Sequence, residues 1–222
     1  MPPTGSATTP RALTDEGRAR ADARAAAVDE ADRRAALESA FASCVKRSGM
    51  PRAYRRPHWA AEAEAALDAF NTGAWLLWLS GDVGRGKSDY AASVLVAAAR
   101  RRPFGRYLWR GDDQLMDSLR DSQGTSGLSG EMAVLAGAGL LVLDDLGKDS
   151  LTRWGLDKLW QLLNRRYEAR LPTVVTSQLD LAGAASLWAS VDERTAKALA
   201  SRMRHRALHV ALSGPDRRLA DG

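Results

Sequence analysis

The feature that most constrains this chain is a glycine-rich turn placed directly after an apolar run. Residues 74–79 read AWLLWL, and residues 80–88 continue as SGDVGRGKS. Three glycines let the backbone curl with its amide groups turned toward a bulky anion, which side chains would otherwise obstruct. Lys87 adds a positive charge, and Ser88 opens a helix whose N-terminus favours anions. The segment therefore predicts a phosphate-binding loop between a buried strand and a helix.

The spacing of this loop fits the pattern G-x-x-x-x-G-K-[ST], in which the lysine reaches the β- and γ-phosphates and the hydroxyl ligates Mg²⁺. A chance glycine turn is the alternative, but the strand before the loop and the helix after it favour a nucleotide site. We therefore expect ATP and Mg²⁺ as cofactors. The residues expected around the bound nucleotide are Gly81, Asp82, Val83, Gly84, Arg85, Gly86, Lys87, Ser88 and Asp89.

A second apolar run ends in two carboxylates, in the segment LLVLDD at 140–145. Beside a phosphate-binding loop, Asp144 would hold the Mg²⁺ that Ser88 also ligates, and Asp145 would orient or deprotonate an attacking water. The alternative is that both aspartates only cap the next turn. The pair follows the loop by about 60 residues at the end of a buried strand. That position favours hydrolysis of the nucleotide.

A third run, TVVTSQ at 173–178, also delivers polar groups to the end of a strand. The amide of Gln178 is suited to sensing a γ-phosphate or to positioning water. Thr176 and Ser177 have two interpretations that the sequence leaves open. They contribute to the site, or they cap the helix that follows.

Apolar runs alternate with helical patterns along most of the chain. This order predicts an α/β fold with a parallel sheet covered on both faces, and ligands in such sheets sit at the carboxyl ends of the strands. Helical patterns cover 59–70, 87–101 and 154–170. The expected strands are 74–79, 105–111, 140–145, 171–178 and 206–214.

The chain of 222 residues suits one domain with an appendage. We expect a disordered tail at 1–10, a helical arm for partner binding at 11–48 and the main domain at 49–222. The arm is rich in alanine and in alternating charges, and its large apolar residues gather near its end, where we expect it to dock. They are Leu37, Phe41 and Val45.

The formal net charge is +5, and basic residues cluster in RAYRRPHW at 52–59, RRYEAR at 165–170 and SRMRHR at 201–206. Such clusters favour contact with nucleic acid. No stretch approaches the roughly 20 apolar residues of a membrane helix, so no membrane contact is expected. The first residues lack a secretory signal and Cys44 is the single cysteine, which predicts a cytoplasmic protein.

Several motifs occur in an order that resembles the DnaC and DnaI helicase loaders and the related IstB transposition ATPases. They are SGMPRAYR, LWLSGDVGRGKS, LLVLDDLGKDS, NRRYEARLPTVVTSQLDL, SRM and GPDRR, and they span about residues 48–219. The resemblance implies an AAA+ P-loop NTPase fold with an N-terminal helical arm. It assigns Lys87 and Ser88 to the Walker A motif and Asp144 and Asp145 to the Walker B motif.

The resemblance also implies roles for residues nearer the C-terminus. Gln178 stands at the sensor position, where the family usually has asparagine, so its longer side chain changes the reach of the amide. Arg202 stands where such proteins carry an arginine finger, which acts on ATP bound by a neighbouring subunit. Arg218 resembles the closing sensor arginine, with Arg217 as the alternative register.

The leading hypothesis is an ATP-hydrolysing helicase loader that binds single-stranded DNA and, through its arm, a DnaB-type replicative helicase. It would form homo-oligomers with ATP at the subunit interfaces. One alternative is an IstB-like transposition helper that binds duplex DNA. Another is a nucleotide-dependent interaction switch with little hydrolysis, which the glutamine at the sensor position suggests.

Overall fold

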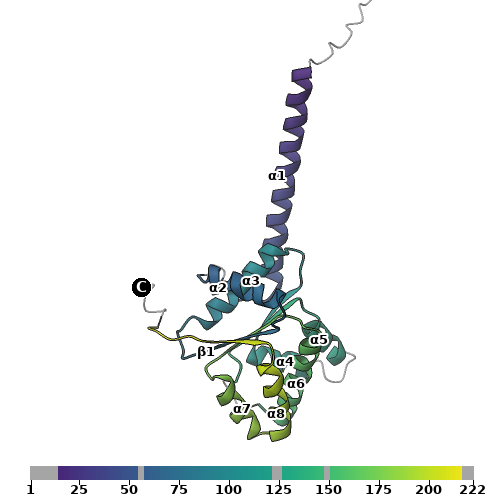
Figure 1. Cartoon of the computed structure of the whole chain (residues 1–222). Helices are drawn as coiled ribbons and strands as arrows, with labels where there is room; N and C mark the ends of the chain where they lie inside the picture. The colour runs from purple at the N-terminus through teal and green to yellow at the C-terminus, as the bar shows by residue number, and fades with distance from the viewer. Residues whose placement is uncertain (1–14, 55–57, 122–126, 148–150, 217–222) are drawn as a thin grey trace, which may run out of the picture. The chain divides into compact units, whose positions relative to one another are not determined.

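The structure is a computed structural model that describes residues 15–54, 58–121, 127–147 and 151–216 (Figure 1). The tail predicted at 1–10 lies outside these residues, as do Arg217 and Arg218. The helices are α1 (Asp15–Arg47), the 3-10 turn η1 (Arg52–Tyr54), α2 (Ala60–Asn71), α3 (Lys87–Arg101), α4 (Asp112–Asp121), α5 (Gly127–Ala136), α6 (Arg153–Glu168), α7 (Leu181–Ala189) and α8 (Glu193–Arg204). The strands are β1 (Leu76–Ser80), β2 (Tyr107–Gly111), β3 (Leu140–Asp144), β4 (Thr173–Ser177) and β5 (Ala207–Ala211).

The five strands form one parallel sheet in the order β2-β3-β4-β1-β5. Alternate residues of each strand pack on opposite faces. In β1, Leu76 and Trp78 belong to one apolar cluster, and Leu77 and Leu79 belong to the other. Helices α2 and α3 cover one face, and α4 to α8 cover the other (Figure 1). This arrangement confirms the predicted parallel α/β sheet, and burial on both faces explains why its strands are continuous apolar runs.

The chain divides into two compact units, Met1–Ser39 and Ala40–Gly222. In the first unit, the side chains of residues 26–39 are exposed, including Leu37 at 43%. In the second unit, the end of α1 joins the core. Val45 is buried, and Phe41 packs against the apolar cluster that contains the buried residues of α2 and α3. The domain boundaries at residues 10 and 48 stay predictions.

One arginine of the basic segment 165–170 belongs to the core instead of the surface. Arg166, in the last turn of α6, has 0% exposure, and burial lowers its pKa to about 9. Its guanidinium is surrounded by acceptors from the start of β4 and from the end of α5. These are the hydroxyl of Thr173 and the carbonyl oxygens of Leu135, Ala136, Ala138 and Pro172. The fully charged group is satisfied by hydrogen bonds, so this residue ties three elements together and offers nothing to nucleic acid.

Arg166→Met should lower the free energy of unfolding by about 3–5 kcal/mol, because several buried carbonyl groups would lose their donor. Urea denaturation measures this loss. Arg165→Met is the matched control, since Arg165 is exposed on the same turn and should change stability by less than about 0.5 kcal/mol. A loss below about 1 kcal/mol for Arg166→Met would contradict the structural role of this arginine.

Candidate nucleotide-binding site

Three strands deliver polar groups to the same edge of the sheet. Strand β1 lies between β4 and β5, and β4 lies beside β3, all in parallel. Ser80 at the end of β1 is in register with Ser177 at the end of β4, and Asp144 is the last residue of β3. The carboxyl ends of these strands therefore meet where the glycine-rich loop leaves β1, as the rule for ligand sites in parallel sheets requires.

The phosphate-binding loop folds tightly around its lysine. Gly86 has a left-handed backbone, φ +86°, and precedes the first residue of α3. Lys87 is buried, and its Nζ donates to the carbonyl oxygens of Gly81 at 2.7 Å and Asp82 at 2.8 Å. The ammonium group is thus held above the start of the loop. It lies where the N-terminus of α3 also favours negative charge.

Two glycines of the loop have backbone conformations that favour glycine, and at Gly81 a neighbouring backbone also leaves no room for a side chain. At Gly81, φ is +138°, and a Cβ would lie 2.3 Å from the carbonyl oxygen of Leu212, just after β5. At Gly84, φ is +79°, and a Cβ would meet the carboxylate of Asp216. The C-terminal segment therefore packs directly on the loop, which the sequence pattern did not reveal.

A single carboxylate oxygen joins the ends of β3 and β4 to the first turn of α3. Oδ1 of Asp144 accepts a hydrogen bond from Ser88 Oγ at 2.8 Å and another from Thr176 Oγ1 at 2.6 Å. Burial raises the pKa of the Asp144 carboxyl, and the hydrogen bonds from Thr176 and Ser88 oppose this shift because they stabilise the ionised form. The residue pair predicted to hold Mg²⁺ is thus in direct contact.

Asp145 is held in an uncommon backbone conformation next to this contact. Its φ is +59°, and its backbone N–H donates to Thr176 Oγ1 at 2.8 Å. Aspartate tolerates this region better than most residues, yet such outliers persist only where the surroundings fix them. The backbone of Asp145 is therefore fixed by β4 directly beside the Asp144 contact.

The structure resolves the question that the sequence left open for Thr176 and Ser177. The N-cap of α7 is Asp180, whose side chain accepts from Gly183 N, so capping by the two hydroxyl residues is wrong. Thr176 instead orients Asp144. Ser177 donates to the carbonyl oxygen of Leu146 at 2.7 Å, which fixes the loop after β3.

The other residues predicted for the nucleotide site that the structure describes are more exposed to solvent than Lys87. Gln178, directly after β4, is exposed, and so is Val83, at 53%. Arg85 pairs with Asp82 at 3.3 Å, which keeps both charges on the outer side of the loop. Asp89, in the first turn of α3, contacts the ring of His58 at 3.1 Å. Arg218 lies outside the described residues.

Arg202 lies toward the opposite edge of the sheet. It is in the last turn of α8, and its guanidinium carbon lies 5.8 Å from the ring centre of Trp160 and 6.0 Å from that of Tyr167. Three residues on, the carbonyl oxygen of His205 accepts from the indole of Trp75, the residue before β1. Five residues of β1, about 15 Å, separate that end from the phosphate loop. The motif resemblance assigns Arg202 to ATP bound by a neighbouring subunit. Its position away from the loop of its own chain leaves that role a prediction.

Comparison with known proteins identifies the family. The model of the IstB-like ATP-binding protein family matches residues 62–221. The chain belongs to this family. Its membership confirms the resemblance drawn from the motifs and shows an ATP-binding protein. A search of curated proteins finds no match.

Solved structures show the same fold. A DnaI crystal structure is 24% identical with a TM-score of 0.62, covering 77% of this chain and 95% of its own. A putative primosome component from Streptococcus pyogenes serotype M3 is 22% identical with a TM-score of 0.60, covering 80% and 98%. The DnaC helicase loader is 17% identical with a TM-score of 0.57, covering 73% and 100%. These matches confirm the AAA+ P-loop architecture.

Mg²⁺ fits the donor set at the strand ends. A serine hydroxyl and one carboxylate are hard oxygen ligands, and Mg²⁺ in nucleotide sites takes few protein ligands together with phosphate oxygens and water. Within the described ranges, no group of three or more His, Cys, Asp or Glu side chains is arranged to hold a metal by itself.

The helices in the described part of the chain include none that is long and apolar enough to cross a bilayer.

Thr176→Val should weaken Mg²⁺-dependent ATP binding by about 10- to 100-fold, because Asp144 would lose the hydroxyl that orients it. Titration calorimetry with and without Mg²⁺ measures the change. Thr176→Ser keeps the hydroxyl and should restore most of the affinity. The control Thr72→Val removes an exposed hydroxyl at the end of α2 and should have no effect. Native affinity in Thr176→Val would contradict this role.

Proposed function

We propose that this chain is an ATP-hydrolysing helicase loader whose ATP site consists of the glycine loop and the ends of β3 and β4. The observation that carries the proposal is the junction at Asp144, where Ser88 from the loop helix and Thr176 from β4 share one carboxylate oxygen. Phosphoryl transfer needs a loop that binds phosphate and residues that hold Mg²⁺. Here the loop, the metal ligands Ser88 and Asp144, and the end of β4 lie together.

Each residue takes a role that its position allows. The loop amides and Lys87 bind the β- and γ-phosphates, with Lys87 released from the two carbonyl groups it contacts in this structure. Ser88 and Asp144 hold Mg²⁺, which supplies positive charge against the phosphate oxygens. Thr176 keeps Asp144 aimed at the metal.

Two further side chains serve the attack of water on the γ-phosphate. Asp145 is half-buried beside the metal ligand, and its fixed backbone presents the carboxylate as the group that orients or deprotonates the water. Gln178 is exposed directly after β4, so its amide has room to approach a γ-phosphate when nucleotide is bound. Arg218 closes the nucleotide from the C-terminal side, where Asp216 already contacts the loop.

Arg202 acts on ATP bound to another copy. Within one chain, the length of β1, about 15 Å, separates the sheet edge near Arg202 from the phosphate loop. The guanidinium lies beside the rings of Trp160 and Tyr167, and its Nη1 donates to the carbonyl oxygen of Ala198 at 3.2 Å. It makes no ion pair with a described residue, so no carboxylate of its own chain competes with an anionic partner. ATP therefore lies at an interface between subunits of a homo-oligomer.

The partners follow from the similar structures, which include a DnaC helicase loader and a primosome component. By analogy, the helical arm binds a DnaB-type helicase and the assembled domain binds single-stranded DNA. The arm presents a long charged surface, since the side chains of residues 26–39 are exposed within their unit.

Lys87→Ala and Arg202→Ala should each lower ATP hydrolysis, the second by about 10³-fold if it removes an arginine finger. A mixture of the two variants should regain part of the activity, because Arg202 of one chain serves the intact loop of the other. Steady-state ATPase assays with single-stranded DNA present measure this, with Arg204→Ala as an exposed control on α8. Full activity in Arg202→Ala would overturn the shared site. Hydrolysis near background in the native chain would favour the nucleotide-dependent switch instead.

A second candidate is an IstB-like transposition helper, and the family match itself favours it. The two candidates differ in the nucleic acid that they bind. The loader should bind a single-stranded oligonucleotide at least about 10-fold more tightly than the matching duplex in the presence of an ATP analogue, as fluorescence anisotropy at fixed salt would show. The reverse preference would replace the loader with the transposition helper.

A further inference from the structure

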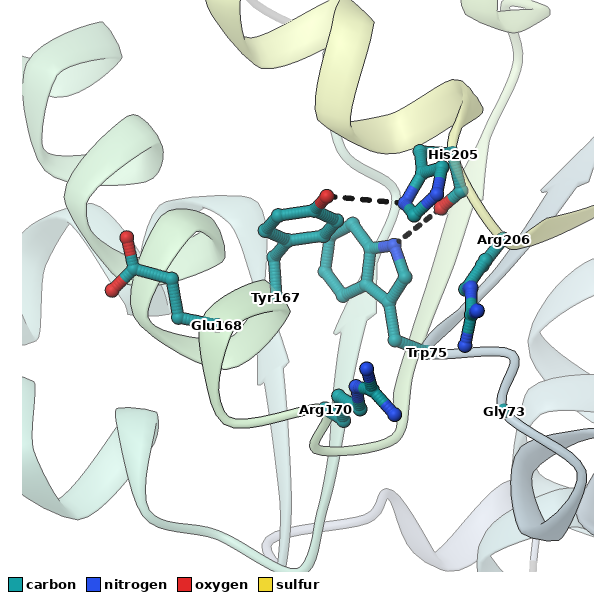
Figure 2. A pocket seen from close by; sticks show the side chains of 7 residues that line it. All are labelled: Gly73, Trp75, Tyr167, Glu168, Arg170, His205 and Arg206. Atoms are coloured by element: carbon teal, nitrogen blue, oxygen red, sulfur yellow. Dashed lines mark hydrogen bonds between the residues drawn. The ribbon is translucent and has the colours of Figure 1, made fainter.

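A small hollow opens at the amino ends of the strands, on the edge opposite the nucleotide site. Its volume is about 240 Å³. Three turns enclose it: the turn between α2 and β1, the turn between α6 and β4, and the turn between α8 and β5 (Figure 2). The lining residues are Gly73, Trp75, Tyr167, Glu168, Arg170, His205 and Arg206.

The aromatic wall of the hollow is fixed by hydrogen bonds. The hydroxyl of Tyr167 and Nδ1 of His205 are 3.1 Å apart, and the Trp75 indole N–H donates to the carbonyl oxygen of His205 at 2.9 Å (Figure 2). The rings of Trp75 and Tyr167 meet edge to face at 5.5 Å. These contacts fix the aromatic wall of the hollow within the chain itself, so binding would cost little rearrangement.

Two arginines stand at the mouth of the hollow in a backbone conformation that favours glycine. Arg170 follows the end of α6 with φ +51°, and Arg206 follows the end of α8 with φ +52°. This position after a helix is usually glycine, because a Cβ is strained there. Of the three non-glycine residues with positive φ in the described part of the chain, two thus flank this one hollow, and the third is Asp145 at the nucleotide site.

Neither arginine has an internal charge partner. In residues 15–54, 58–121, 127–147 and 151–216, the structure gives Arg170 and Arg206 no ion pair and no side-chain hydrogen bond. Glu168 does not neutralise them, because its carboxylate accepts from Asn164 at 2.9 Å and points away from Arg206 (Figure 2). Two guanidinium groups beside a preformed cavity suit an oxyanion.

We propose that this hollow receives a carboxylate from helix α4 of a second copy of this chain. The inference rests on the proposed shared ATP site. Arg202 lies within 6.0 Å of the ring of Tyr167, and that ring lines the hollow. If Arg202 reaches the nucleotide of a neighbour, the hollow next to it faces the same neighbour close to that nucleotide.

Helix α4 carries the matching charge at the matching place. It begins directly at the carboxyl end of β2, and Asp112 accepts from the backbone of Gly147 at 3.3 Å, which places α4 beside the loop after Asp144. The side chain of Asp117 is 69% exposed, but it pairs with Arg120 of the same helix at 3.3 Å. Asp113 is exposed, and it is the carboxylate offered to the hollow. A basic edge on one copy thus meets an acidic edge on the next, which is a head-to-tail contact.

The positive φ of Arg170 and Arg206 allows both charges to be removed without destabilising the fold. Arg170→Gly combined with Arg206→Gly removes both charges while glycine accepts the backbone conformation, so the melting temperature should stay equal or rise. Sedimentation velocity with a non-hydrolysable ATP analogue should show the dissociation constant of the assembly rising by about 10- to 100-fold. The control Arg165→Gln with Arg204→Gln removes the same charge from exposed positions on α6 and α8 and should assemble like the native chain.

The reciprocal variant is Asp113→Lys, which should weaken assembly by a similar factor. Native assembly in either variant would overturn the proposal, as would weakening by the control. A native chain that binds ATP but stays monomeric would also overturn it, while leaving the ATP site intact. Normal assembly combined with lost affinity for a single-stranded oligonucleotide in the glycine variant would overturn it and assign the hollow to nucleic acid.

Discussion

The parallel register of β1, β3 and β4 is the constraint on which the site depends. Each strand ends at the same edge, so three short polar segments that are far apart in the sequence meet at one carboxylate oxygen of Asp144. Burial raises the pKa of that carboxyl, and two hydroxyl donors stabilise its charged form. A buried anion prepared in this way binds a cation more readily than it stays unpaired, which is why the same junction that holds the sheet edge together is suited to Mg²⁺.

Arginines serve two purposes in this molecule. One stabilises the interior, and others lie exposed or partly exposed at one edge of the sheet. Arg166 is buried and stabilises the fold through carbonyl acceptors. Arg202 and the strained pair Arg170 and Arg206 lie at the amino ends of the strands, away from the phosphate loop. In the proposed function, these arginines complete the nucleotide site of a second copy, which requires copies that meet head to tail.

The sequence predicted the phosphate loop and the magnesium pair because both are local patterns attached to buried strands. It left Thr176 and Ser177 ambiguous, since a hydroxyl residue at a strand end looks the same whether it caps a helix or orients a carboxylate. It counted Arg166 as a surface charge because burial depends on tertiary acceptors. The strain at Arg170 and Arg206 was invisible, since backbone angles follow from how two helices end, and the helices α7 and α8 were not predicted from their alanine-rich sequence.

The central claim is that Ser88 and Asp144 jointly hold Mg²⁺ with ATP on the glycine loop. The most direct test is the affinity of the native chain for ATP, measured by titration calorimetry in Mg²⁺ and again in excess chelator. We predict that ATP binds at least about 10-fold more tightly with Mg²⁺, because the metal links the phosphates to both side chains. Equal affinity in the two conditions, or no binding in either, would contradict it.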